Sequence, residues 1–363
     1  MKLLLYLLLI FGGTAASAQV VAATLQHDGG TREFLYYLPP GYQLSTPSPV
    51  IIALHGLNNP PVDFMPRTLF NDVADTANFV TVYPAALSSF IGTSWNSGTD
   101  PTQSADDVGF IDALIDTMHL LTNIDLNRVY VFGFSQGGFM ASRLVCQLPN
   151  RVTALATIAG TMHTTIEASC VLTQPMPAFH AHGTADNNVS IDGNSILGLL
   201  SANDLVDFWV GENNCVTPPL TSMLPDTYAD GLTVDLTYYP FCDQQTEVIF
   251  YKVNGLDHNL TGPNNDIYYA EAVWRFFRKY GAPISTNNES AEESKIKVYP
   301  TVTSDAVYIE DATGTVVTVF DLSGQLLKQK RIDNSLETIS LAKFPSGSYI
   351  IKIQDQAFKI VRH

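Results

Sequence analysis

A serine between glycines is the first feature of this sequence that could carry out chemistry, in the segment Gly133-Phe-Ser135-Gln-Gly137-Gly138. The pattern Gly-x-Ser-x-Gly is typical of a nucleophile at a sharp turn from a strand to a helix, where glycines let the two elements approach each other. The apolar run Val129 to Phe132 predicts the strand, and a helix is expected from Gln136 onward. Ser135 is therefore predicted to attack a carbonyl carbon.

A serine nucleophile needs a base within hydrogen-bond reach and an acid that orients the base. At this kind of turn the chain order is serine, then Asp or Glu, then His. His258 fits the base, because it lies in a turn-rich stretch after the strand-like run Val248 to Val253, and loops at the carboxyl ends of parallel strands carry function. Asp186 follows the strand-like run Ala178 to His182 in the same way and is predicted to be the acid. Asp257 is the alternative acid, ranked lower because adjacent side chains of an extended segment point apart.

The other histidines are excluded as the base by their positions in the chain. His180 and His182 lie in a predicted strand, and the loop after that strand is needed for the acid. The rest precede the serine, follow it too closely, or end the chain: His27, His55, His119, His163 and His363.

The carbonyl oxygen also needs two backbone N–H donors for the negative charge that develops on it. One donor is predicted at Gln136, the residue after the nucleophile. The second is predicted at Leu57, in the loop after the buried-type strand Val50 to Leu54, because Gly56 permits a tight turn just before it. A plain glycine turn at the end of that strand is the alternative for this loop.

This chemistry requires no cofactor and no metal, and no pair of Cys or His residues has the spacing of zinc ligands. The formal charge of −16 argues against a nucleic-acid partner, because such binding depends on Lys and Arg neutralising phosphates. An acidic surface should also be repelled by anionic membranes.

Residues 1–18 are predicted to be a secretory signal. Met1-Lys2 gives a positive start, Leu3 to Phe11 is apolar, and Ala16-Ser17-Ala18 is a small-residue cleavage site. The apolar run is too short for a membrane anchor, which needs about 20 residues, and no later stretch is predicted to span a membrane.

Export makes the four cysteines candidates for disulfide bonds, since oxidising compartments preserve them. Cys146, Cys170, Cys215 and Cys242 allow three pairings. Sequence order favours Cys146 with Cys170 and Cys215 with Cys242, each closing a short loop. Free buried thiols are the alternative.

Short apolar runs alternate with helical patterns over residues 19–283, and this alternation predicts a doubly wound, mostly parallel α/β sheet. The runs expected to be buried strands are Val50 to Leu54, Val80 to Tyr83, Val129 to Phe132 and Ala178 to His182. The expected helices are Asp106 to Asn123, Phe139 to Leu148, Ser201 to Gly211 and Asp266 to Tyr280.

The composition changes after Pro283. Residues 284–296 are mostly polar, small and acidic and are predicted to be a linker. Residues 297–363 contain short strand-like runs separated by turns such as Ser323-Gly324, which predicts a small all-β sandwich.

Residues 30 to 280 resemble the extracellular polyhydroxybutyrate depolymerase and feruloyl-esterase group of α/β hydrolases. The resemblance implies an α/β-hydrolase fold with nucleophile Ser135, acid Asp186, base His258 and oxyanion donors Leu57 and Gln136. The segments that carry it are Leu54-His-Gly56, Val82-Tyr-Pro84, Ser94-Trp-Asn96, Asp106-Asp-Val-Gly-Phe110, Gly133-Phe-Ser-Gln-Gly-Gly138 and His182-Gly-Thr-Ala-Asp186.

The sequence departs from this group around the base, where Leu256-Asp-His258-Asn-Leu-Thr-Gly262 lacks the usual Trp. The aromatic wall that this Trp would form beside the base is therefore expected to be absent. The Leu-His-Gly and Gly-Phe-Ser-Gln-Gly-Gly pieces also resemble acyl-protein thioesterases and small carboxylesterases, but Trp95-Asn96 and Asp106 to Phe110 favour the depolymerase and feruloyl-esterase group.

Residues 297–363 resemble the C-terminal sorting domain of bacterial type IX secretion, through Val298-Tyr-Pro300, Asp321-Leu-Ser-Gly324, Pro345-Ser-Gly-Ser-Tyr349 and Lys359-Ile-Val-Arg362. This resemblance implies contact with the secretion machinery, and then release or attachment at the outer-membrane surface. A substrate-binding β module is the alternative, disfavoured because most aromatic residues of the segment are expected to face its core.

The residues and the resemblance together predict a secreted serine esterase that hydrolyses carboxylic esters, of the feruloyl, acetyl or another short acyl type, through an acyl-enzyme. The first alternative is a polyhydroxyalkanoate depolymerase, and the second is a non-catalytic surface binding protein that uses the same fold as a scaffold. A serine peptidase would share the nucleophile, acid and base, but no propeller-like or lid domain is evident.

Overall fold

The computed structural model describes residues 18–99, 102–281, 296–300, 302–321, 326–353 and 356–362. The predicted signal segment, except Ala18, and the predicted linker, except Ile296, lie outside the described residues. Among the described residues, no helix combines the length and the apolar composition needed to cross a bilayer.

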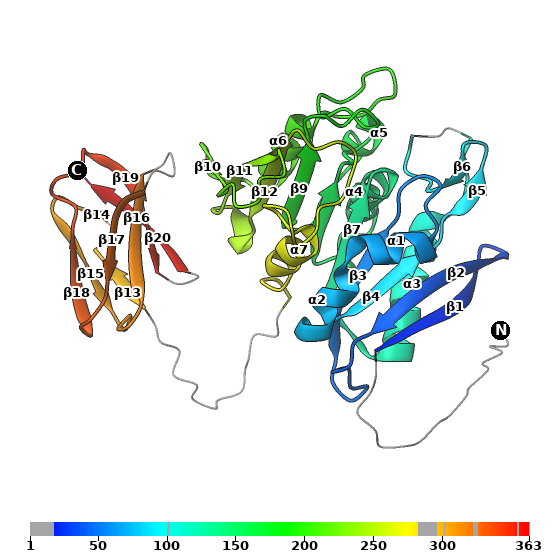
Figure 1. Cartoon of the computed structure of the whole chain (residues 1–363), viewed down its shortest axis with the longest axis horizontal. Coiled ribbons are helices and arrows are strands. Elements are labelled where there is room, and N and C mark those ends of the chain that lie inside the picture. The colour runs from blue at the N-terminus through cyan, green and yellow to red at the C-terminus, as the bar shows by residue number, and fades with distance from the viewer. Residues whose placement is uncertain are drawn as a thin grey trace.

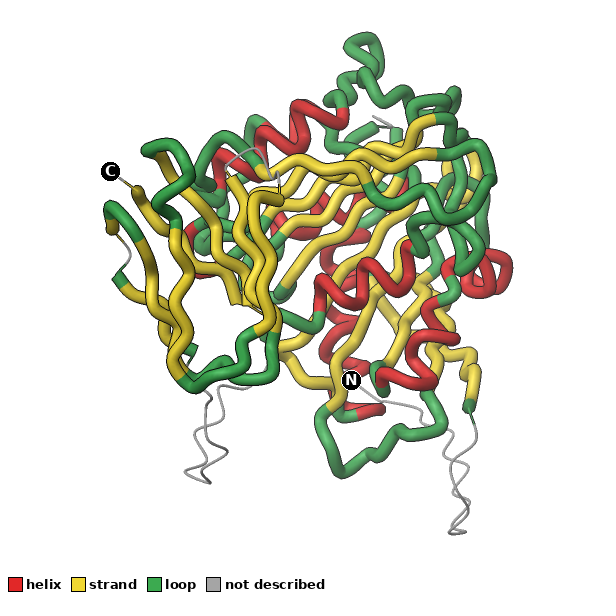
Figure 2. Tube along the Cα trace, turned by 60° about the vertical axis from the view of Figure 1, so that its left-hand side comes forward, coloured by secondary structure: helices red, strands yellow, loops and turns green. Residues whose placement is uncertain are grey.

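A ten-stranded sheet runs through the first part of the chain in the order β1-β2-β4-β3-β7-β8-β9-β12-β11-β10 (Figures 1 and 2). The central strands from β4 to β12 are parallel, and antiparallel strands extend the sheet at both edges. A separate hairpin of β5 and β6 follows β4. The bounds are β1 Gln19–His27, β2 Gly30–Leu38, β3 Ser48–Leu54, β4 Val80–Pro84, β5 Leu87–Ser89, β6 Gly92–Ser94, β7 Ile124–Phe134, β8 Ala154–Ile158, β9 Ala178–Gly183, β10 Leu220–Met223, β11 Thr233–Tyr239 and β12 Val248–Asn254.

Helices cover both faces of this sheet, as the alternation of the sequence predicts. Residues from α3, α4 and α6 pack on one face, and residues from α1, α2 and α7 pack on the other. The bounds are α1 Pro61–Thr68, α2 Phe70–Ala77, α3 Asp107–Thr122, α4 Gln136–Gln147, α5 Thr164–Glu167, α6 Ala202–Glu212 and α7 Tyr269–Phe277, with a short 3-10 turn at Asp243–Gln245.

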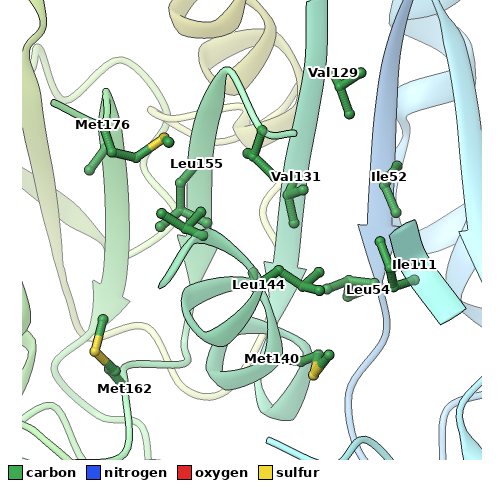
Figure 3. Packing of buried hydrophobic residues seen from close by; sticks show 14 of the residues in the cluster. Ile52, Leu54, Ile111, Val129, Val131, Met140, Leu144, Leu155, Met162 and Met176 are labelled. Atoms are coloured by element: carbon green, nitrogen blue, oxygen red, sulfur yellow. The ribbon is translucent and has the colours of Figure 1, made fainter. Parts of the chain in front are cut away.

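The central strands are buried on both faces because successive side chains point to opposite sides of the sheet. Ile52 and Leu54 of β3 join the cluster under α3 and α4, whereas Ile51 and Ala53 join the cluster on the other face. Figure 3 shows the first cluster, in which Leu144 of α4 lies against the strands. The prediction of central strands from continuous apolar runs is thus confirmed.

The edges of the sheet differ from this pattern and were not predicted. Exposed and half-exposed residues alternate along β1, so this edge strand is not buried on both faces as the central strands are. Helix α1 contains Pro66, which weakens its helical signal. The helix predicted over Asp266 to Tyr280 is real but shorter, because α7 begins only at Tyr269.

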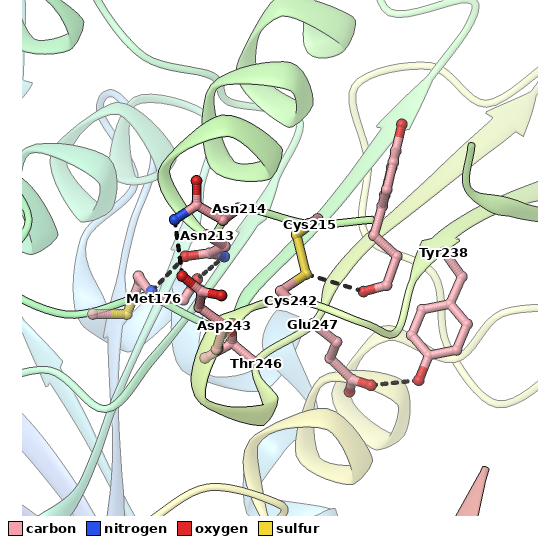
Figure 4. The surroundings of a disulfide bond; sticks show 10 residues. Met176, Asn213, Asn214, Cys215, Tyr238, Cys242, Asp243, Thr246 and Glu247 are labelled. Atoms are coloured by element: carbon pink, nitrogen blue, oxygen red, sulfur yellow. Dashed lines mark hydrogen bonds between the residues drawn. A yellow bond between two sulfur atoms is a disulfide. The ribbon is translucent and has the colours of Figure 1, made fainter. Parts of the chain in front are cut away.

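Both disulfides favoured by sequence order are formed in the structure. Cys146 at the end of α4 bonds to Cys170, and Cys215 after α6 bonds to Cys242 after β11. Beside the second bond, the buried Asn213 joins two segments, because its side chain accepts from the backbone N–H of Met176 and donates to the Met176 carbonyl, both at 2.7 Å (Figure 4).

The C-terminal part forms a three-stranded sheet, β13-β15-β18, and a five-stranded sheet, β14-β20-β19-β16-β17. One apolar cluster draws buried residues from both sheets, including Val307, Val319 and Ile351, so this part has its own core. Tyr299 and Tyr308 are each 41% exposed and do not face that core. The bounds are β13 Lys297–Tyr299, β14 Val302–Thr303, β15 Ala306–Glu310, β16 Val316–Asp321, β17 Leu326–Arg331, β18 Leu336–Ser340, β19 Gly347–Ile353 and β20 Gln356–Arg362.

Candidate active site

Ser135 occupies the turn between β7, which ends at Phe134, and α4, which begins at Gln136. Its φ of 57° and ψ of −125° are unusual for a residue with a side chain. Such a conformation costs about 1–3 kcal/mol and persists only where the surroundings impose it. The backbone N–H of Ser135 donates to the Ile158 carbonyl at 2.9 Å, which ties the turn to the end of β8.

Three glycines make this turn possible because backbone atoms occupy the places where their side chains would be. A Cβ on Gly133 would lie 2.1 Å from the Gly137 carbonyl oxygen, and one on Gly137 would lie 2.0 Å from the Leu54 carbonyl oxygen. A Cβ on Gly160 would lie 2.1 Å from the carbonyl oxygen of Ser135. The glycines of the sequence motif, together with Gly160, are therefore required by close backbone contacts.

Asp186 and His258 come together from the loops after β9 and β12. The imidazole Nδ1 of His258 lies 2.7 Å from Oδ2 of Asp186, whose side chain is fully buried. The other carboxylate oxygen accepts the backbone N–H groups of Asn188 and Val189, both at 2.9 Å. A carboxylate can only accept, so His258 carries its proton on Nδ1 and leaves Nε2 free as a base.

Burial alone would raise the pKa of the Asp186 carboxyl, but hydrogen bonds from His182, His258 and the Val189 N–H outweigh it and hold the pKa well below its usual range. Asp186 is therefore ionised at neutral pH and can orient an imidazole. Because the folded-state pKa is depressed, this carboxylate contributes stability above its ordinary pKa, and that contribution is lost as the pH falls toward the folded value.

His258 lies beside the serine turn. Its ring centroid is 4.9 Å from that of Phe134, the residue before Ser135. Among the contacts of the described residues there is no hydrogen bond between the Ser135 hydroxyl and His258, a bond that often tightens only when substrate binds. The exposed Asp257 points elsewhere, since its carboxylate meets the backbone N–H of Asn187 at 3.4 Å.

The two predicted N–H donors lie on either side of the serine. Gln136 opens α4, where a backbone N–H has no partner within the helix. Gly56 lies against Ser135, because a Cβ on it would be 3.1 Å from the serine Cβ, and Leu57 follows directly. Within the described part of the chain, the backbone N–H of neither Leu57 nor Gln136 has a hydrogen-bond acceptor. Both are thus available to a substrate oxygen.

Buried side chains that the sequence did not single out for this role support the loop of Leu57. His55 accepts the Ala86 N–H at Nε2, at 3.1 Å, so its Nδ1 carries the proton and donates to the Gly56 carbonyl at 2.7 Å. Burial lowers the pKa of His55 to about 4, so this imidazole stays neutral. Trp95 donates its indole N–H to the His55 carbonyl at 2.9 Å, and its backbone N–H to the side chain of Gln136 at 3.1 Å.

A second histidine, which was not predicted as a site residue, lies beside Asp186, the predicted acid. His182 was excluded as the base because it belongs to a strand, and it is indeed in β9, yet its Nε2 is 3.5 Å from Oδ2 of Asp186. Its position four residues before Asp186 at the end of a buried strand is the signal that could have revealed it. Among the described residues, no group of His, Cys, Asp or Glu side chains is arranged to hold a metal ion.

Three exposed apolar side chains, Leu57, Phe90 and Ile91, lie in loops on this edge of the sheet and are called the apolar rim here. Leu57 is 43% exposed, and Asn58 clamps the β5–β6 hairpin by donating its backbone N–H to the Thr93 carbonyl and accepting the Thr93 N–H, both at 2.9 Å. At the tip of that hairpin Phe90 is 93% exposed and Ile91 is 42% exposed. The hairpin follows the carboxyl end of β4, the same edge of the sheet that carries Ser135 (Figure 1).

The N-terminal α/β part and the C-terminal β part of the chain are each similar to a known protein family. Residues 45–217 match the phospholipase/carboxylesterase family, and residues 297–363 match the secretion system C-terminal sorting domain. The solved structure of an acetyl xylan esterase from Aspergillus awamori superposes with a TM-score of 0.53 over 71% of this chain and 99% of that chain, at 13% identity. That likeness concerns the fold alone and confirms the α/β-hydrolase architecture.

Two curated proteins extend the similarity in sequence. A bifunctional acetylxylan esterase/xylanase of Neocallimastix patriciarum is 30% identical over 253 residues, which is 69% of this chain and 34% of that protein. Feruloyl esterase D of Neurospora crassa is 25% identical over 279 residues, which is 74% of this chain and 88% of that protein. The chain therefore spans about a third of the first relative and most of the second.

Substitution of Gly137 tests whether backbone contacts impose the serine turn. Gly137→Ala should lower the free energy of unfolding by about 3 kcal/mol or more, because its Cβ would overlap the Leu54 carbonyl. Gly211→Ala in α6 is the matched control, since its Cβ would have nothing within 4 Å, and it should be neutral or stabilising by about 0.5–1 kcal/mol. Urea denaturation followed by circular dichroism measures both. Equal stability of the two variants would contradict the close approach at Gly137.

Proposed function

Because the chain is an α/β-hydrolase of the phospholipase/carboxylesterase family that ends in a secretion sorting domain, we propose that it cleaves carboxylic esters with Ser135, His258 and Asp186. The observation that carries this proposal is the 2.7 Å bond between Asp186 and His258 beside a serine held in a strained turn. A pure binding protein, the non-catalytic alternative, would need neither the strained backbone nor the buried carboxylate that fixes an imidazole.

The reaction proceeds through an acyl-enzyme. Oγ of Ser135 attacks the ester carbonyl carbon while Nε2 of His258 takes the hydroxyl proton, and the carbonyl oxygen becomes an oxyanion. The N–H groups of Leu57 and Gln136 stabilise that oxyanion. The C–O bond to the alcohol then breaks, and His258 gives the proton to the leaving alkoxide. Water, deprotonated by His258, attacks the acyl-serine and releases the carboxylic acid and free Ser135.

Asp186 acts through His258. The imidazolium that forms in each half of the reaction carries a positive charge, and the ionised Asp186 at 2.7 Å stabilises it. The same hydrogen bond keeps the neutral imidazole in the form with Nε2 unprotonated. Loss of this hydrogen bond should therefore lower kcat strongly and change KM only slightly.

Three substitutions test the assignment on 4-nitrophenyl acetate. Ser135→Ala should abolish 4-nitrophenol release, and Asp186→Asn should lower kcat by about 10³–10⁴-fold, as expected when the imidazole loses its orienting carboxylate. Asp257→Asn, the neighbouring alternative, should keep kcat close to that of the parent. A parent rate retained in Ser135→Ala, or a larger loss in Asp257→Asn than in Asp186→Asn, would overturn the assignment.

For the substrate, we propose aryl or acyl esters of plant polymers. Two relatives by sequence are named for acetylxylan and for feruloyl esters, which supports the class. The apolar rim of Leu57, Phe90 and Ile91 supports an apolar or aromatic group next to the scissile bond, because such a group would cover side chains now facing water. A polyhydroxyalkanoate depolymerase remains the second candidate, since an aliphatic polyester could also contact this rim.

Turnover of methyl ferulate, acetylated xylan and a hydroxybutyrate oligomer separates these substrates. We expect turnover of methyl ferulate, and Phe90→Ser should raise its KM by roughly fivefold to tenfold, the loss expected for about 1–1.4 kcal/mol of apolar contact. Leu120→Ser is the matched control, because Leu120 is 82% exposed near the end of α3, at the opposite edge of the sheet from Ser135. Activity on the hydroxybutyrate oligomer alone would replace the plant-ester proposal.

The C-terminal part makes this a secreted protein, released or held at the extracellular surface, since a sorting domain directs export. We propose that it is a separate domain from residue 297 onward, contacting the secretion machinery and contributing nothing to catalysis. Its own apolar cluster supports this division, because a part with its own core can fold by itself. All the residues assigned to the chemistry lie before Gly281.

A chain ending at Pro283 tests whether the C-terminal part serves export and not catalysis. It should fold and keep the parent kcat and KM on 4-nitrophenyl acetate, because no assigned residue is removed. In a host with type IX secretion it should accumulate in the periplasm, whereas the full chain is exported. If the shortened chain were exported normally and lost activity only on an insoluble polymer, the C-terminal part would be a substrate-binding module.

A further inference from the structure

A row of buried polar side chains runs from β8 to the acid of the site. Oγ1 of Thr157 lies 2.8 Å from Nδ1 of His180, and Nε2 of His180 lies 3.2 Å from Nδ1 of His182. Nε2 of His182 lies 2.8 Å from the Val189 carbonyl and 3.5 Å from Oδ2 of Asp186. All five of these residues are buried, so the row has little access to water.

When both imidazoles are neutral, the Val189 carbonyl fixes every proton in this row. A carbonyl only accepts, so His182 must carry a proton on Nε2 and, as a neutral imidazole, must accept at Nδ1. His180 must then donate from its own Nε2 to His182 and accept at Nδ1. Thr157 is left to donate its hydroxyl proton to His180. The hydrogen bonds therefore all run in one direction, from Thr157 to the Val189 carbonyl.

We propose that His182 is a positioning residue for the reaction, which holds the Asp186 carboxylate and its loop in the orientation that His258 needs. The inference rests on the proposed function, because it assigns to His182 a role in the chemistry of that site. His182 touches both ends of a short loop: its Nε2 meets Asp186 at the start and the Val189 carbonyl three residues later. The same loop bends back on itself, because the N–H of Val189 donates to Asp186.

A purely space-filling role would not call for this row. Two imidazoles and a hydroxyl in a sheet interior cost free energy unless each is hydrogen-bonded, and apolar side chains of similar volume would fill the same space without that cost. Phe250 already packs on His180, with ring centroids 5.4 Å apart, so an aromatic side chain suits this environment. What apolar side chains could not supply is an N–H donor that binds the Val189 carbonyl at 2.8 Å while its nitrogen stays 3.5 Å from the Asp186 carboxylate.

The tautomers test the row in the unmodified protein. Nitrogen-15 NMR of labelled imidazoles should show His180 and His182 protonated on Nε2 alone. His55 gives an internal contrast, because its contacts require a proton on Nδ1 alone. A proton on Nδ1 of His182, whether alone or together with Nε2, would overturn the proposal, since Nδ1 could then not accept from His180. This result does not depend on any enzymatic activity.

Substitutions test the consequence for catalysis. His182→Leu should lower kcat on 4-nitrophenyl acetate by about tenfold or more, on the scale of losing an outer hydrogen-bond partner of a functional group, with a smaller change in KM. His182→Gln, whose side-chain amide can still donate, should recover most of that loss. The acid limb of the pH profile of kcat/KM should move to lower pH in His182→Leu, because a carboxylate that has lost its orientation stabilises the His258 imidazolium less.

Two further measurements separate positioning from stability and from the proposed function. His119→Leu removes another histidine that is hydrogen-bonded to a carbonyl, that of Ile124 at 2.8 Å, but at the opposite edge of the sheet, and it should leave kcat and the pH profile unchanged. If His182→Leu lowers the melting temperature yet keeps the parent kcat and acid limb, the positioning role is wrong. If the Ser135→Ala variant keeps the activity of the parent protein, the proposed function is wrong. The NMR measurement of the tautomers would still test the hydrogen-bonded row of Thr157, His180 and His182.

Discussion

The close approach of three backbone segments at Ser135 is the constraint on which the rest of the site depends. The end of β3 presses its Leu54 carbonyl toward Gly137, and β8 is followed by Gly160, which touches the carbonyl of Ser135. With β7 and α4 fixed this tightly, the serine has no freedom to relax from its positive φ. Its hydroxyl is thereby displayed at the carboxyl edge of the sheet, and the first N–H of α4 lies beside it.

The other parts of the site reach this point from neighbouring loops. The sheet order β7-β8-β9-β12 places the loops after β9 and β12 near the serine turn, so Asp186 and His258 meet across 72 residues of chain. Electrostatics then acts at short range. The buried carboxylate of Asp186 is held ionised by several donors, and its single negative charge selects the imidazole tautomer that can act as a base.

Much of this arrangement could be predicted from the sequence, because the required features are local. Central strands are recognisable in the sequence as apolar runs. The glycines around Ser135 are recognisable as a motif, and they are needed because the backbone contacts there leave no room for a side chain. Chain order and loop position then led to Asp186 and His258. The antiparallel edge strands β1 and β10 were missed, because they are exposed or half-exposed along their length and do not show the buried run of a central strand.

The supporting histidines were missed for a different reason. His55 and His182 act through neighbours that are distant in the sequence, such as Ala86 and Val189, and a one-dimensional pattern does not show which carbonyl a buried imidazole faces. The exposed tip at Phe90 gave no signal either, since a single aromatic residue in a turn is compatible with burial or exposure. The proposed substrate preference rests on such side chains, which the motifs around Ser135 do not reveal.

Covalent labelling shows whether the turn at Ser135 presents an activated nucleophile. The full chain would be treated with diethyl 4-nitrophenyl phosphate, which transfers a diethylphosphoryl group to a nucleophilic serine and releases 4-nitrophenolate, and its peptides would then be mapped by mass spectrometry. We expect one phosphoryl group per chain on the peptide containing Ser135, loss of esterase activity in proportion to labelling, and no labelling of Ser135→Ala. Labelling at another residue, or full activity after Ser135 is labelled, would contradict this expectation.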